Sequence, residues 1–296
     1  MGTTDQVAAL FILLLAGLLM FKCGIITPQV LGGLNKLLVN LALPCLTLMR
    51  LQEDISPQVL GDMGQIFLYA AAGMLLVCIL GFVIFKRQSP DRKAVFINLT
   101  TFSNAGFMGY PVVAAAFGED KVIYAVAYVM AFNFLSWTLG VWIYQKGQAP
   151  KLKQFLTPAL LAVPVGIATS LLGIRFPQAL GSAMNYLGST TTPLSMLVVG
   201  ARLASLNKEA LKDPMLMLSS LLRLVVYPCV LWGLMSLTGC SLMVRQIVFL
   251  LCAMPSAAMS VIQAEIYHCD SPLASRGVAL STALSVITIP LILTIL

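Results

Sequence analysis

Long apolar runs separated by short polar segments make up most of this chain. Two apolar stretches near the start cover about 7–26 and 29–49, and the second is interrupted only by Lys36. A helix needs about 20 apolar residues to cross a bilayer. The run 224–244 is taken as part of a span at about 214–238 that includes Arg223. The pattern then predicts ten transmembrane helices. Eight runs contain no Asp, Glu, Lys or Arg: 63–85, 94–118, 122–145, 154–174, 176–201, 224–244, 246–264 and 277–296.

The composition agrees with this pattern. Hydrophobic residues make up 59% of the 296 positions and charged residues only 10%. The seven cysteines are scattered without any Cys-x-x-Cys pair, so we expect them to pack as small apolar residues rather than bind metal or form disulfides. The chain is therefore predicted to be an all-α membrane protein surrounded by the lipid bilayer, with no cofactor, no metal and no nucleic-acid partner.

Basic residues gather in alternate loops between the predicted helices. One set of loops holds twelve of the 18 Lys and Arg residues: Lys22, Lys86, Arg87, Arg92, Lys93, Lys146, Lys151, Lys153, Arg202, Lys208, Lys212 and Arg276. The other set holds four: Arg50, Lys121, Arg175 and Arg245. Cytoplasmic loops carry an excess of Lys and Arg, so the first set is predicted to lie inside. Both termini then lie outside, in the periplasm if the membrane is a bacterial inner membrane.

The two halves of the chain repeat a pattern at an offset of about 150 residues. Five predicted spans per half is an odd number, so the second half is expected to be inverted in the membrane, as in many secondary transporters. We divide the chain into a first repeat at 1–145, a cytoplasmic linker at 146–154 and a second repeat at 155–296. Prolines are also common in membrane helices that do not repeat. The matched positions are Asn35 with Asn185, Pro44 with Pro193, Arg50 with Arg202, and Pro111 with Pro255.

The fourth predicted span contains residues that do not suit a membrane helix. Residues Ser103–Pro111 read Ser-Asn-Ala-Gly-Phe-Met-Gly-Tyr-Pro. Proline removes a backbone donor and clashes with the carbonyl four residues back, and glycine weakens a helix by about 1 kcal/mol relative to alanine. Freed backbone groups are tolerated in a bilayer only where protein or water satisfies them. The pattern predicts a broken helix near Gly106–Pro111, with a counterpart at Pro255, and a substrate site beside the break.

Three segments together resemble the auxin efflux carrier family, in particular its short bacterial members. Asn104–Pro111 resembles the signature of that family's fourth span, Ala253–Tyr267 its ninth and Ser275–Pro290 its last. The resemblance covers the whole chain. It implies that broken helices four and nine cross, that the substrate is a small organic anion such as a mono- or dicarboxylate, and that the protein is a homodimer. The plant members have a long loop after span five and a proline where this chain has Ser103, which argues against auxin itself.

Asn104 is the first candidate for contact with the anion. Its amide donates hydrogen bonds without a fixed charge, and a half-helix N-terminus beside it suits a carboxylate. Alternatively, Asn104 satisfies only freed backbone groups of its own helix. The other candidates are glycines and prolines that shape the backbone and hydroxyls that add donors: Ser103, Gly106, Gly109, Pro111, Pro255, Ser256 and Thr191.

Two charged residues within predicted spans are further candidates, because charges in a membrane are costly and usually functional. Arg223 lies about nine residues into span eight, and Glu265 ends span nine towards the cytoplasm. They are candidates for a charge pair, and Glu265 alternatively for proton coupling or for an interfacial position. Arg223 alternatively attracts anions.

The sequence favours a secondary active transporter that works by alternating access. Spans three to five and eight to ten are expected to move against spans one, two, six and seven. The chain has a single histidine and no His-Glu-x-x-His zinc motif, which argues against an intramembrane enzyme. A sodium-coupled organic anion symporter and, less favoured, an anion channel remain alternatives, because broken helices line both kinds of protein.

Overall fold

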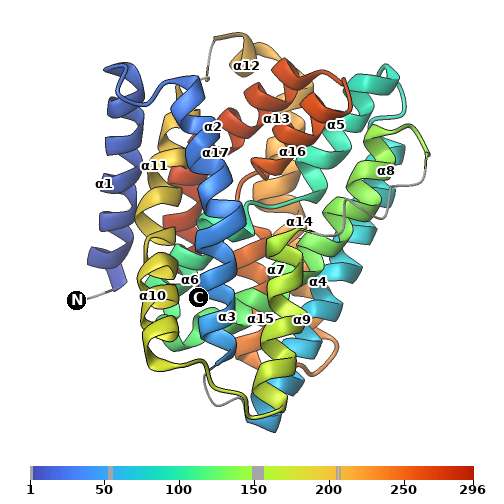
Figure 1. The fold of residues 1–296 in the computed structure, drawn as a ribbon. Helices are drawn as coiled ribbons and strands as arrows, with labels where there is room; N and C mark the ends of the chain where they lie inside the picture. Colours follow the sequence, from blue (N-terminus) through green and yellow to red (C-terminus); the bar gives the residue numbers. More distant parts are fainter. Residues whose placement is uncertain (1–2, 53–55, 149–156, 205, 207) are drawn as a thin grey trace.

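The computed structural model describes residues 3–52, 56–148, 157–204, 206 and 208–296. Within these residues every regular element is a helix, and a single β-bridge joins Ser103 to Ser256. Figure 1 shows the helices standing side by side with their axes roughly along one direction.

The helices follow the chain in this order: α1 (Thr3–Lys22), α2 (Pro28–Leu37), η1 (Leu38–Ala42), α3 (Leu43–Leu51), α4 (Pro57–Ile84), α5 (Pro90–Thr101), η2 (Ala105–Gly109), α6 (Tyr110–Phe117), η3 (Glu119–Lys121), α7 (Val122–Leu135), η4 (Ser136–Gly140), α8 (Val141–Tyr144), α9 (Pro158–Leu171), α10 (Gln178–Ser189), α11 (Thr191–Leu203), α12 (Lys208–Lys212), α13 (Pro214–Leu221), η6 (Leu222–Val226), α14 (Tyr227–Ser236), α15 (Leu242–Cys252), α16 (Met259–Ile266) and α17 (Ser271–Leu293). Here η1, η2, η4 and η6 are π-helical turns and η3 is a 3₁₀ turn.

Six helical stretches among the described residues are long and apolar enough to cross a membrane. They are Asp5–Lys22, Pro28–Leu51, Pro57–Ile84, Glu119–Tyr144, Pro214–Ser236 and Ser271–Leu293. Many of their large apolar side chains are exposed, for example Leu68 and Ile79 on α4, as expected where lipid is the solvent. The prediction of an all-α membrane protein is confirmed. The other four predicted spans contain shorter helices, so length alone does not establish a count of ten.

Local sequence explains where several of these helices begin. A serine, threonine or aspartate stands immediately before the helix, and its side-chain oxygen accepts a hydrogen bond from a backbone N–H of the first turn. At α17, for example, Leu273 N donates to Asp270 Oδ1 at 2.9 Å. A proline within the first two helical positions fixes φ without losing an internal hydrogen bond. The capping residues are Thr27, Ser56, Thr157, Asp213, Ser241 and Asp270.

Three π-helical turns end two residues before a proline and let a helix continue through it. Pro44 follows η1, Pro111 follows η2 and Pro228 follows η6. A proline clashes with the carbonyl four residues back, and a π turn relieves this clash because its hydrogen bonds reach five residues back. The predicted interruption of this span is therefore present, but its position at Gly106–Pro111 is wrong. The chain leaves helical geometry earlier, at residues 102–104, and Pro111 sits in the first turn of α6.

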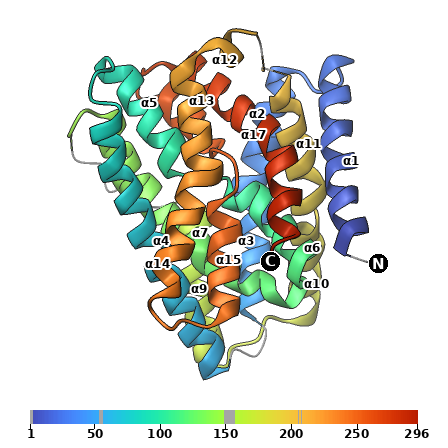
Figure 2. The same cartoon turned by 180° about the vertical axis from the view of Figure 1, so that it is seen from behind.

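The helices pack in two groups. In one group α1 packs against α11, and α3 packs against both α9 and α10. In the other group α4 packs against α5 and α7, α14 against α15, and α17 against α13 and α16. Figures 1 and 2 show the two groups from opposite sides, with α1, α10 and α11 at one edge and α4 and α5 at the other.

Glycines bring α1 and α11 into direct backbone contact. A Cβ added to Gly200 would lie 1.8 Å from the carbonyl oxygen of Leu14, and one added to Gly17 would lie 2.2 Å from that of Leu197. Small residues permit such close approach of membrane helices. This contact joins the beginning of the chain to its second half.

We expect Gly200→Ala to destabilise the protein by about 1–3 kcal/mol, because the added methyl must push the two backbones apart. Thermal unfolding of the purified protein in detergent measures the effect. Gly233→Ala is the matched control, since nothing lies within 4 Å of the Cβ added there. Equal unfolding temperatures for the two variants would show that the close contact is absent.

Candidate functional site

Two interrupted helices cross at the centre of the molecule. After α5 the chain leaves helical geometry through residues 102–104, and after α15 it is irregular through residues 253–258. The two segments pair in antiparallel fashion: Asn104 N donates to Pro255 O at 2.7 Å, and Ala257 N donates to Phe102 O at 2.9 Å. Each break thus satisfies backbone groups that the other leaves without helical partners, as hydrocarbon requires.

The guanidinium of Arg223 lies at the C-terminal ends of the two helices that lead into this crossing. Arg223 lies on η6, is fully buried, and donates to four backbone carbonyls at the ends of two helices. At the end of α5 it reaches Thr100 O at 3.0 Å and Thr101 O at 2.9 Å. At the end of α15 it reaches Met254 O at 3.2 Å and also the carbonyl of Cys252. The last carbonyls of a helix have no internal donors, so one side chain caps both helix ends.

Hydroxyl groups complete the crossing. Ser256 Oγ donates to Leu99 O at 2.8 Å, and Ser256 N donates to Ser281 Oγ at 3.1 Å. Ser103 Oγ lies 3.2 Å from Tyr128 Oη. All of these side chains are buried, so the two predicted serines hold the crossing together through contacts within the protein.

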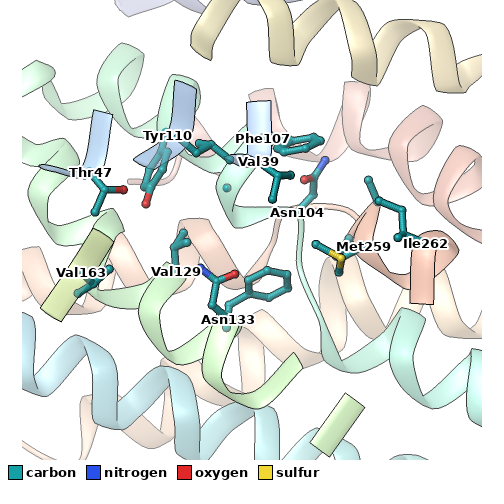
Figure 3. Close-up of a pocket in the computed structure, with 15 residues that line it drawn as sticks. Val39, Thr47, Asn104, Phe107, Tyr110, Val129, Asn133, Val163, Met259 and Ile262 are labelled. Atoms are coloured by element: carbon teal, nitrogen blue, oxygen red, sulfur yellow. The ribbon is translucent and has the colours of Figure 1, made fainter. Parts of the chain in front are cut away.

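A cavity of about 60 Å³ lies against the crossing. A water molecule needs roughly 10–15 Å³ on this measure, so the cavity has room for several waters or a small ligand. Its polar side chains are Asn104 beside the crossing, Asn133 on α7, Thr47 on α3 and Tyr110 on α6 (Figure 3). The rest of the wall is mostly apolar, and no described lining residue is acidic or basic. The apolar residues are Val39, Leu43, Phe107, Val129, Phe132, Val163, Ala257, Ala258, Met259 and Ile262.

Two helices begin at this cavity without a side-chain cap. The helix η2–α6 begins after Asn104, and α16 begins after Ala258; neither residue forms a side-chain capping hydrogen bond. The first N–H groups of a helix lack internal acceptors, and the N-terminal end carries about half a positive charge. The cavity therefore offers two partially positive helix ends and an amide, which suits a negatively charged group.

The cavity adjoins a larger vestibule of about 770 Å³ at one end of the molecule. Val39, Met259 and Ile262 line both spaces. The vestibule lies where α1 ends and α2 and α17 begin, at the top of Figure 1. Its charged lining residues are Lys36, Arg202 and Glu265.

At the opposite end of the molecule, an ion pair joins the two packing groups. Arg50, in the last turn of α3, pairs with Glu119, the first residue of η3. The vestibule shares lining residues with the cavity, and this ion pair lies at the other end of the molecule.

Comparison with known proteins adds the identity of the family. A model of a family described as membrane transport protein matches residues 3–152 and 147–293. The chain belongs to this family, which includes the auxin efflux carriers. The family consists of membrane transporters rather than enzymes, and the resemblance found in the sequence is confirmed.

Two archaeal relatives match this transporter along its length. An uncharacterized transporter of Methanocaldococcus jannaschii is 25% identical over 301 residues, covering 97% of this chain and 96% of the relative. An uncharacterized transporter of Methanothermobacter thermautotrophicus is 26% identical over 303 residues, covering 98% of this chain and 97% of the relative.

The candidate residues of this transporter fall into three places. Asn104 and Gly106 line the cavity. Ser103, Pro255 and Ser256 form the crossing itself. The remaining three lie in helices: Gly109 and Pro111 are buried around the start of α6, and Thr191 is buried at the start of α11.

The suggested charge pair of Arg223 and Glu265 is not formed in the described part of the chain. Arg223 caps the crossing, whereas Glu265 is exposed in the last turn of α16 and lines the vestibule. The separation follows from helix geometry: α16 carries Glu265 away from the crossing, toward the end of the molecule.

Sequence reasoning missed most of the cavity wall. Thr47, Tyr110 and Asn133 are not among the candidate residues, and nothing around Thr47 or Asn133 in the sequence marks a break. Asn133 lies four residues beyond Val129, another lining residue, and this helical spacing on a predicted span is the one local signal for it.

Two glycines of η2 have different surroundings: Gly106 lines the cavity, whereas Gly109 packs against a neighbouring side chain. A Cβ on Gly106 would meet only Leu43 Cδ1 at 3.9 Å, whereas one on Gly109 would lie 2.5 Å from Leu251 Cδ2. We expect Gly106→Val to block ligand binding with little loss of thermal stability, and Gly109→Val to lower thermal stability. Thermal unfolding and ligand-induced stabilisation of both variants measure the two effects. The reverse assignment of effects would contradict the described geometry.

Proposed function

We propose that this transporter is a secondary active carrier of a small organic anion, a mono- or dicarboxylate, and that it works by alternating access. One observation carries the proposal: two uncapped helix N-termini meet at a cavity that also contains the amide of Asn104. These groups provide donors for a carboxylate without placing a fixed charge in the cavity wall.

The cavity wall supports a carboxylate with an apolar body over a more polar anion. Phe107, Phe132 and Met259 are among the lining residues, and ligand sites commonly combine apolar walls with a few polar groups that fix orientation. The carboxylate is proposed to lie at Asn104, with the apolar body toward α7 and α3.

The proposed architecture is ten spans in two inverted repeats, at 1–145 and 155–296. The crossing supports it, because its backbone bonds join residue pairs 102 with 257 and 104 with 255, symmetrically about the bridge of Ser103 and Ser256. Bridged residues 103 and 256 are themselves separated by about the repeat offset. The predicted linker at 146–154 lies largely outside the described residues.

The proposed orientation puts the vestibule in the cytoplasm and both termini in the periplasm, with the protein in the inner membrane. The connections α1–α2 and α4–α5 and the short helix α12 lie at the vestibule end (Figure 1). These segments belong to the set of loops rich in Lys and Arg, which favours the cytoplasmic side.

Alternating access is proposed to move the group containing α4–α8 and α13–α17 against the group containing α1–α3 and α9–α11. The cavity supports this division, since both groups line it. In the described state the vestibule is open at one end and Arg50 pairs with Glu119 at the other. Transport then requires that this pair separate as the vestibule closes.

Asn104→Ala tests the substrate site. The probes are acetate, propionate, isobutyrate, benzoate, phenylacetate, malonate and succinate, screened for thermal stabilisation of the wild-type protein, since a ligand of the native state raises its stability. Uptake of the most stabilising probe into proteoliposomes should fall at least tenfold in Asn104→Ala while the protein stays folded. Asn185→Ala is the control, because Asn185 is exposed on α10. Wild-type uptake by Asn104→Ala, or stabilisation by none of the probes, would overturn the proposal.

Glu119→Gln tests whether the ion pair of Arg50 and Glu119 keeps the end opposite the vestibule closed. Exposed ion pairs contribute up to about 1 kcal/mol, so the variant should shift the equilibrium toward outward-open molecules by up to about fivefold. The readout is labelling of Thr47→Cys, in a background without native cysteines, by a membrane-impermeant thiol reagent added outside. Lys121→Gln is the control, because Lys121 pairs with its neighbour Asp120. Unchanged labelling in Glu119→Gln would exclude the pair as a contact that closes this end.

A further inference from the structure

Arg223 carries a charge that no described carboxylate neutralises. The described ion pairs involve Arg50, Arg92, Lys121 and Lys146 instead. A guanidinium stays protonated in proteins, and burying a charge is costly unless its donors are satisfied. Here the four carbonyls at the ends of α5 and α15 satisfy them, and the ring of Tyr227 lies 4.8 Å away.

The partial charges at the crossing can be summed. Each helix end carries about half an elementary charge, negative at the C-terminus and positive at the N-terminus. The C-terminal ends of α5 and α15 therefore contribute about one negative charge, which the guanidinium of Arg223 offsets. The N-terminal ends of η2–α6 and α16 contribute about one positive charge, and they begin at the cavity. Without Arg223 the partial charges of the four helix ends would nearly cancel.

We propose that Arg223 is a positioning residue that leaves the crossing with about one net positive charge and so makes the carrier selective for monovalent carboxylates. This inference rests on the proposed function, whose site it deepens. Asn104 follows Thr101 by three residues, at most about 11 Å along an extended chain. Arg223 is not among the residues that line the cavity, so it acts on the anion through the field of the crossing and not by contact. A dicarboxylate would leave one charge uncompensated against apolar walls.

The test compares binding of a carboxylate with binding of its uncharged amide. Benzoate with benzamide and isobutyrate with isobutyramide are matched in size, and malonate tests the divalent anion. Wild-type protein should bind a monocarboxylate more tightly than its amide and more tightly than malonate. Arg223→Gln should reduce the ratio of carboxylate to amide affinity about tenfold, the order expected for one charge at this separation in a partly screened interior. Arg223→Lys, which keeps the charge, should retain the ratio within about threefold.

Two outcomes would overturn the role of Arg223 while leaving the proposed function intact. In the first outcome, Arg223→Gln binds the carboxylate and the amide more weakly by the same factor, so the ratio of their affinities stays at the wild-type value. Structural damage alone gives this result. The other is an equal loss of the ratio in Arg223→Lys and Arg223→Gln. Gly277→Ala, whose added methyl would lie 2.3 Å from Leu99 Cδ1, provides a destabilised variant of unchanged charge and should keep the ratio. Failure of the wild-type protein to bind any probe carboxylate would overturn the proposed function as well.

Discussion

The structure depends on how two interrupted helices satisfy their backbone groups away from water. Unpaired N–H and C=O groups cost several kcal/mol each in hydrocarbon, so an isolated break in a membrane helix is not stable. Here each break supplies the other's partners through Asn104 N with Pro255 O and Ala257 N with Phe102 O. Arg223 satisfies the carbonyl ends that remain. Neither broken helix can form this geometry without the other.

The same constraint produces the functional asymmetry of the crossing. The C-terminal ends of the first half-helices are capped by Arg223, whereas the N-terminal ends of the second half-helices begin uncapped at the cavity. Donors that protein groups do not satisfy are available to a ligand. An anion at this position would meet oriented backbone dipoles, and little reorganisation of the protein would be needed to stabilise it.

Much of the fold could be predicted from the sequence because the bilayer imposes long apolar helices and an asymmetry of basic loops. The family followed from residues near Asn104 and Pro255, and the family match confirms it. The position of the break could not be predicted from Pro111, because a π turn before the proline lets α6 start there. The role of Arg223 was missed because its partners come from helices far away in the sequence. Thr47, Tyr110 and Asn133 were missed for the same reason: only the packing of α3, α6 and α7 brings them to one cavity.

Locating a bound carboxylate tests the central claim most directly. The measurement is an experimental structure of the carrier with 4-bromobenzoate, in which anomalous scattering from bromine identifies the ligand and its orientation. The account predicts the carboxylate beside Asn104, between the N-termini of η2–α6 and α16, with the bromine among the apolar residues of the cavity. A ligand bound only in the vestibule near Lys36 and Arg202, with water filling the cavity at the crossing, would contradict it.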